Sequence, residues 1–100
     1  MLVRVRGDLY PIEASLSING EPVNLTNSVV KFGYIKDNTK LANIIIGVVT
    51  DPLAGKVRFQ PTAVDFKEAG EFTFDIEAVV NEIPTTYKVD RLRIKEDVSK

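Results

Sequence analysis

Apolar and polar residues alternate with a period of two along much of this chain, and the pattern is clearest over 71–80. The apolar positions there are Phe72, Phe74, Ile76 and Ala78, and the polar positions are Glu71, Thr73, Asp75 and Glu77. Successive side chains of a β-strand point to opposite faces, so the segment predicts a strand with one buried and one solvated face. That pattern is typical of an antiparallel sheet.

The same alternation, bounded by turn-forming residues, predicts further strands. They cover 1–6, 11–18, 29–36, 41–50, 56–60 and 85–95, with a short arm over 21–25. Asn19-Gly20 and Asn81-Glu82 are each placed to close a two-residue hairpin. In 85–95 the alternation slips, which predicts a bulge near Asp90.

One segment carries a weak helical signal. Residues 61–69 predict a single helical turn with Thr62 as its cap, and Val64 and Phe66 would cover the end of the core. The chain otherwise reads as about seven to eight short strands with frequent turns, which indicates an all-β fold of the sandwich or small-barrel kind. Its length predicts a single domain over residues 1–100.

The chain has no cysteine, so a sandwich must hold its sheets together by packing without a disulfide, which fits assembly in a reducing cytoplasm. Its formal net charge is −1, from 13 basic and 14 acidic residues. So weak a field predicts neither nucleic acid nor a membrane surface as partner. The N-terminus has no signal-peptide pattern, and the longest apolar run is too short to span a bilayer.

Catalytic chemistry is not predicted. The chain has no histidine, and nothing in it supplies a nucleophile, a metal or an apolar pocket around a pair of carboxylates. We therefore expect no enzyme, no cofactor, and no catalytic, cofactor-binding or metal-binding residue. Glu71, Asp75 and Glu77 are better explained as cross-strand partners of Lys88, Arg91 and Arg93 than as a cation site.

Segment 41–49 is apolar on both faces around its three consecutive isoleucines. Such a strand is either covered on both sides inside a sheet or exposed at an edge, where it can add to the sheet of a partner. The residues alone leave both readings open. The candidate interface residues are Leu41, Ile44, Ile45, Ile46 and Val48.

Several short motifs, taken in order, resemble a known family. They are Gly7-Asp8, 22–26, 30–32, Thr50-Asp51-Pro52-x-x-Gly55-Lys56-Val57-x-Phe59, and Ala63-x-Asp65-x-x-x-Ala69-Gly70-x-Phe72-x-Phe74-x-Ile76. Their order and spacing resemble the immunoglobulin-like domain at the N-terminus of baseplate upper proteins of tailed bacteriophages, and related small phage tail and structural proteins. The resemblance implies an immunoglobulin-like antiparallel β-sandwich. Phe74 would replace the sheet-bridging cysteine of immunoglobulin domains, and Phe72 cannot make their tyrosine-corner hydrogen bond.

The resemblance also implies a function. It predicts a virion structural protein of the tail or baseplate, assembled in the host cytoplasm, which contacts other virion proteins and forms a homo-oligomer or ring. In baseplate upper proteins more chain follows this domain, whereas the sequence here ends at Lys100.

Two other functions fit the same fold. A carbohydrate- or cell-surface-binding module would expose two or more of Tyr10, Tyr34 and Tyr87 on one face. A small sheet-capping adaptor or inhibitor would be a stable monomer with one bare edge strand.

Overall fold

The computed structural model describes residues 1–37, 42–62 and 64–96, and within them the chain forms strands and turns but no helix. The strands are β1 (Leu2–Val5), β2 (Ile12–Ser15), β3 (Ser17–Ile18), β4 (Glu21–Pro22), β5 (Val29–Lys36), β6 (Ala42–Ile46), β7 (Val48–Asp51), β8 (Lys56–Phe59), β9 (Gly70–Val80) and β10 (Ile83–Lys95). The predicted all-β class is confirmed. The structure has more strands than the sequence predicts, because the predicted strands over 11–18 and 41–50 are each divided into two.

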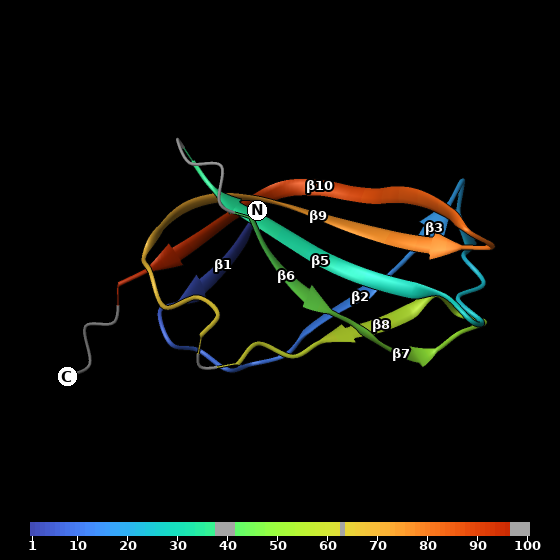
Figure 1. Cartoon of the computed structure of the whole chain (residues 1–100), viewed down its shortest axis with the longest axis horizontal. Coiled ribbons are helices and arrows are strands. Elements are labelled where there is room, and N and C mark those ends of the chain that lie inside the picture. Colours follow the sequence, from blue (N-terminus) through green and yellow to red (C-terminus); the bar gives the residue numbers. More distant parts are fainter. Residues whose placement is uncertain (38–41, 63, 97–100) are drawn as a thin grey trace.

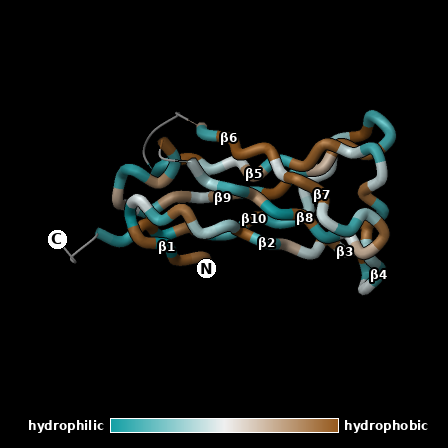
Figure 2. Tube along the Cα trace, turned by 90° about the horizontal axis from the view of Figure 1, so that it is seen from below, coloured by the Kyte–Doolittle hydropathy of each residue, from teal (hydrophilic) through white to brown (hydrophobic). Residues whose placement is uncertain are grey.

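Two larger sheets pack face to face, as Figure 1 shows. One has five strands in the order β1-β10-β9-β5-β6, the other has three in the order β2-β8-β7, and β3 and β4 form a separate hairpin. All pairings are antiparallel except that of β1 with β10, which is parallel. Viewed from below, β6 and β7 lie along one side of the sandwich, and β1 and β2 along the other (Figure 2).

Aromatic rings join the two sheets at the centre of the core. The Phe32 ring on β5 stacks on Phe74 of β9 with centroids 4.8 Å apart, and it meets Phe59 of the opposite sheet at 5.6 Å. Phe32 and Phe59 are fully buried, and all five phenylalanines of the chain belong to the buried core. In a chain without cysteine, these contacts perform the sheet-joining role that a disulfide has in immunoglobulin domains.

The predicted helical turn over 61–69 is wrong. The chain forms a turn in which Asp65 N–H donates to the Thr62 carbonyl at 3.0 Å, and the Thr62 N–H donates to Asp65 Oδ2 at 2.9 Å. Thr62 thus donates to the Asp65 side chain instead of capping a helix. Phe66 is buried as expected, but Val64 is 70% exposed and covers nothing.

A tyrosine anchors this turn to the sheet. The hydroxyl of Tyr34, on β5, donates to Asp65 Oδ1 at 2.9 Å, while the Tyr34 ring packs against Phe66 and Phe72. Phe72 has no hydroxyl and cannot make a tyrosine-corner hydrogen bond. The hydrogen bond from Tyr34, on the neighbouring strand β5, to Asp65 takes its place. Burial, followed by the hydrogen bond to Asp65, raises the pKa of Tyr34.

The predicted strand over 41–50 is also wrong as a single element. It divides at Gly47, so that β6 belongs to the five-stranded sheet and β7 to the three-stranded sheet. The Gly47 N–H donates to the Val30 carbonyl at 2.8 Å, and its Cα lies directly over the core. A Cβ there would meet Val57 Cγ2 at 2.6 Å and Phe59 Cε1 at 2.7 Å, so only glycine fits where the chain crosses between sheets.

The turn predictions have mixed outcomes. Both two-residue hairpins are confirmed, with φ values of 52° and 83° at Asn19-Gly20 and of 51° and 66° at Asn81-Glu82. The bulge in β10 exists, but it lies between Thr86 and Lys88, not near Asp90. Between the two positions the faces are therefore reversed, so that Val89 is exposed and Lys88 lies on the inner face, while Leu92 and Ile94 are buried as the sequence pattern predicts.

Replacing Gly47 by alanine should destabilise the domain by about 1–3 kcal/mol, because a methyl group would displace Phe59 and Val57 in a packed core. Chemical denaturation measures this difference. The matched control is Gly33→Ala, because a Cβ at Gly33 meets the end of the exposed Asp75 side chain at 3.2 Å and otherwise only the Asn43 carbonyl, at 4.0 Å. Equal stabilities of the two variants would contradict the packing argument.

Removing the Tyr34 hydroxyl by Tyr34→Phe should lower the free energy of unfolding by about 1–2 kcal/mol, since a part-buried hydrogen bond to a carboxylate is lost. Tyr10→Phe is the control, because the Tyr10 side chain is 72% exposed and its ring packs on no other aromatic ring. Urea titrations of the three proteins provide the comparison. A Tyr34→Phe variant as stable as wild type would show that the bond contributes nothing.

The raised pKa of Tyr34 also predicts a pH effect. Above about pH 10 an unfolded tyrosine loses its proton while folded Tyr34 keeps it, so the unfolded state binds fewer protons. The contribution of Tyr34 to the free energy of unfolding is therefore fully present below about pH 10 and is lost as the pH rises above that value. The free energy of unfolding should therefore fall more steeply between pH 10 and 11 in wild type than in Tyr34→Phe. Parallel slopes would refute this account.

Candidate interaction surface

Strand β6 lies at an edge of the five-stranded sheet, where β5 is its one partner among the described residues. Among the described residues β6 is thus an edge strand and not an interior one, and its pairing with a partner stays a prediction. Ile44 and Ile46 are each 58% exposed and Val48 of β7 is 64% exposed, whereas Ile45 is buried in the core. Leu41, the remaining candidate interface residue, lies outside the described residues.

The hydrogen-bonding pattern shows which backbone groups of β6 point away from its one partner strand in the described part of the chain. Gly47 donates to the carbonyl of Val30, directly opposite, and hydrogen-bonded pairs alternate along an antiparallel ladder. Asn43 and Ile45 therefore direct their N–H and C=O groups toward β5. Ala42, Ile44 and Ile46 direct theirs away from it, so three donors and three acceptors lie along the free edge.

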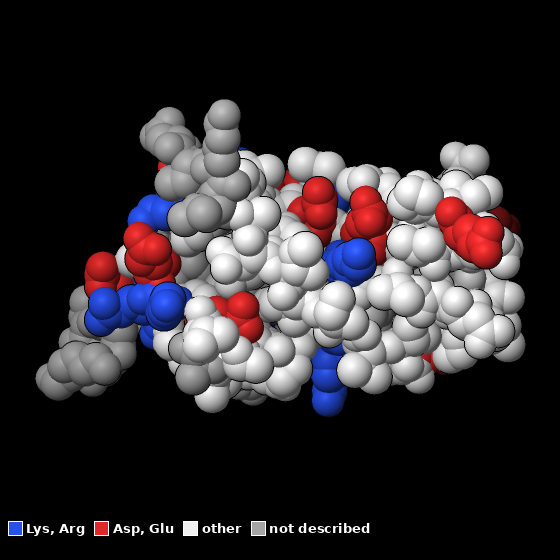
Figure 3. Space-filling view, viewed as in Figure 1, with Lys and Arg blue, Asp and Glu red and all other residues white. Residues whose placement is uncertain are grey.

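Other edge strands of the two sheets carry features that discourage pairing. Arg4 lies within β1, Pro11 precedes β2 and Glu13 lies within it, and β7 is interrupted by a register shift before Asp51. β6 contains neither a charged residue nor a proline. Figure 3 shows the side on which β6 and β7 lie, where uncharged atoms cover most of the central surface.

The outer face of the five-stranded sheet continues this apolar edge. One row across the strands places Val89, Asp75, Gly33 and Ile44 opposite one another. A shallow hollow of about 290 Å³ lies here, with Ile35 and Val89 among its walls. Burial, together with the neighbouring charge of Glu77, raises the pKa of the Asp75 carboxyl.

Charged groups gather at one end of this face. Arg91 donates to both carboxylate oxygens of Asp37, at 2.6 and 3.1 Å, and to Thr73 Oγ1 at 2.9 Å. Arg93 Nε donates to Glu71 Oε1 at 2.6 Å, so the predicted pairing of Glu71 is confirmed. The Arg91 guanidinium lowers the pKa of Asp37.

The other predicted cross-strand pairs are wrong. Asp75 lies opposite Val89 and Glu77 opposite Thr86, while Lys88 lies opposite Ile76 and shares its inner face. The bulge before Lys88 accounts for this, because it places Lys88 on the inner face and Val89 on the outer face opposite Asp75. The side chain of Lys88 instead lines a hollow between the sheets.

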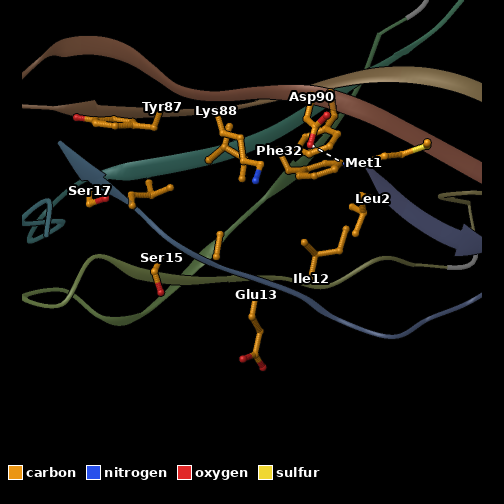
Figure 4. Close-up of a pocket in the computed structure, with 14 residues that line it drawn as sticks. Met1, Leu2, Ile12, Glu13, Ser15, Ser17, Phe32, Tyr87, Lys88 and Asp90 are labelled. Atoms are coloured by element: carbon orange, nitrogen blue, oxygen red, sulfur yellow. Dashed lines mark ion pairs between the residues drawn. The ribbon is translucent and has the colours of Figure 1, made fainter. Parts of the chain in front are cut away.

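That hollow, of about 590 Å³, lies on the side of the sandwich where β10 and β2 are not joined. In Figure 4, Tyr87, Lys88 and Asp90 of β10 lie above it and Ile12 of β2 lies below. The Met1 ammonium pairs with Asp90 at 3.3 Å across its mouth. Phe32 is part of its floor.

Within the described ranges no three His, Cys, Asp or Glu side chains are grouped so that they would hold a metal ion. No helix there is long and apolar enough to cross a membrane. Of the three tyrosines, Tyr34 is buried and Tyr87 is partly buried against the core, which leaves Tyr10 as the exposed one.

The chain matches the model of a known protein family. The family model described as BppU N-terminal domain matches residues 5–89, a range that contains β2 to β9 in full and most of both large sheets. No curated protein matches the chain.

Proposed function

The chain belongs to the BppU N-terminal domain family, that of the phage baseplate upper protein, and on this premise we propose that it acts in the baseplate through protein–protein contacts. Membership confirms the resemblance of its motifs and indicates a bacteriophage baseplate structural protein located in the virion. The match over most of the chain is the observation that carries the proposal.

The surface of the domain supports contact with protein. β6 offers unpaired backbone groups beside the exposed side chains of Ile44 and Ile46, and Val48 continues the apolar surface onto β7. The net charge of −1 provides little long-range attraction. We infer that affinity comes from apolar contact and backbone pairing, with other virion proteins or further copies of this chain as partners in a ring.

The carbohydrate-binding alternative lacks its expected platform. Tyr34 faces the core, all five phenylalanines are buried, and the chain has no tryptophan. Tyr10 alone is not a stacking surface with two aromatic rings. The sheet-capping alternative shares the bare β6 edge with our proposal and differs from it in oligomeric state.

Antibodies against this chain should label the baseplate end of the tail in particles of the phage that encodes it, as seen by immunogold electron microscopy. Mass spectrometry of purified particles should recover the chain in stoichiometric amounts. Particles without the chain, or labelling confined to the capsid, would refute the proposed role.

The same particles test which surface matters. The variant Ile44→Lys/Ile46→Lys places two charges on the exposed side of β6 and should lower incorporation into particles at least about tenfold, since burying an unpaired charge opposes contact. Ile18→Lys is the matched control, because Ile18 is 52% exposed on the separate β3–β4 hairpin. Equal incorporation of both would show that β6 is not the contact.

A further inference from the structure

We propose that two copies of this chain pair through β6, antiparallel and about a two-fold axis at Ile44, so that their five-stranded sheets join into one continuous sheet. This inference rests on the proposed function, which it deepens by naming the partner and the register. It starts from the three residues whose backbone groups point away from β5, namely Ala42, Ile44 and Ile46.

Only one antiparallel register uses all of these groups. With the axis at Ile44, that residue faces its own copy, and Ala42 faces Ile46 of the second copy on each side. All three are then hydrogen-bonded pairs, because their N–H and C=O groups point to the free edge. An axis at Ile46 would instead carry Ile44 toward the second copy's Val48, beyond Gly47, where the chain has already left the sheet.

The side chains suit the same register. Ala42, Ile44 and Ile46 all lie on the outer face of the sheet. In this register the two Ile44 side chains meet at the axis. On each side of them, Ile46 of one copy lies beside the smaller Ala42 of the other. Cross-strand pairs of this kind stabilise a sheet when their volumes fit and no like charges oppose. Ile45 remains in the core of its own copy.

The charges allow a second copy. On the outer face of β5 and β6, Lys31 is the nearest charge to the axis, opposite Ile46. Strand spacing and rise place the two Lys31 positions about 20 Å apart in the dimer, more than twice the screening length at physiological salt. The other charges near this region, Asp75 and Glu77, lie one strand further from the axis.

The absence of cysteine permits a direct test with single-cysteine variants. In the proposed dimer the two Cα atoms of residue 44 lie about 5.5 Å apart, within the range for a disulfide. Ile44→Cys should therefore form a covalent dimer under mild oxidation. Val48→Cys is comparably exposed, but Val48 lies four residues from the axis and in the other sheet, so its two copies would lie beyond the reach of a disulfide and should not crosslink.

A mixed pair tests the register. Ala42→Cys and Ile46→Cys should each form no disulfide-linked dimer alone, because identical positions lie about 14 Å apart, and should form a disulfide-linked heterodimer when mixed. Crosslinking of Val48→Cys as efficient as that of Ile44→Cys, or no crosslinking of the mixed pair, would overturn the register.

Light scattering after size exclusion, over a wide concentration range, tests the dimer without a disulfide. Wild type and Ile18→Lys should have the mass of a dimer that dissociates reversibly on dilution, while Ile44→Lys should be monomeric with an unchanged far-ultraviolet circular dichroism spectrum. A monomeric wild type at every concentration would overturn the inference.

That outcome is separable from failure of the proposed function. A monomer whose particles are still labelled at the baseplate would leave the function standing and favour pairing of β6 with another virion protein. A dimer absent from particles would sustain the pairing and refute the function.

Discussion

The contact between Phe32 and Phe59 is the interaction on which the rest of the structure depends. It joins the two sheets at their centre, and Phe74 of the neighbouring strand β9 stacks on Phe32 within the same sheet. Since no disulfide crosses the core, the spacing of the sheets is set by how closely these rings pack. The position of Gly47 follows, because the chain passes over Phe59 so closely that no side chain fits.

The crossing at Gly47 in turn creates the candidate interaction surface. If 41–50 were one continuous strand, its apolar residues would lie in a single sheet. The crossing instead limits β6 to five residues at the edge of one sheet and moves Val48 to the edge of the other. An apolar segment that a long interior strand would bury is thereby left exposed.

Local patterns predicted the parts of this fold that local physics determines. The alternation over 71–80 identified the inner face of β9, and the asparagine-containing pairs identified both two-residue hairpins, because side-chain period and positive φ are properties of neighbouring residues. The division at Gly47 was not predictable in this way, since Phe59 and Val57, which require it, follow it in sequence and meet it only through the fold. The parallel pairing of β1 with β10 depends likewise on contacts between the two ends of the chain.

The bulge in β10 shows a subtler limit. The sequence revealed that the alternation slips, but Tyr87 and Val89 seemed to share a buried face because both are apolar. In the structure Val89 is exposed, and Lys88 and Asp90 line the hollow beside β2. The three-stranded sheet is too narrow to cover this part of β10, so water reaches its inner face and polar side chains are tolerated there. The pattern of apolar residues therefore could not show where the bulge lies.

The candidate site was predictable as a segment but not as a geometry. Ile44, Ile45 and Ile46 were grouped by their common apolarity, yet the strand divides them, with Ile45 in the core and the other two on the surface. The surface is also short, because Gly47 ends β6 after its third outward-directed residue. Long flat edges promote open-ended aggregation, whereas an edge with three outward-directed residues offers few registers for pairing. The same close packing that holds the core together therefore also limits how this domain can associate.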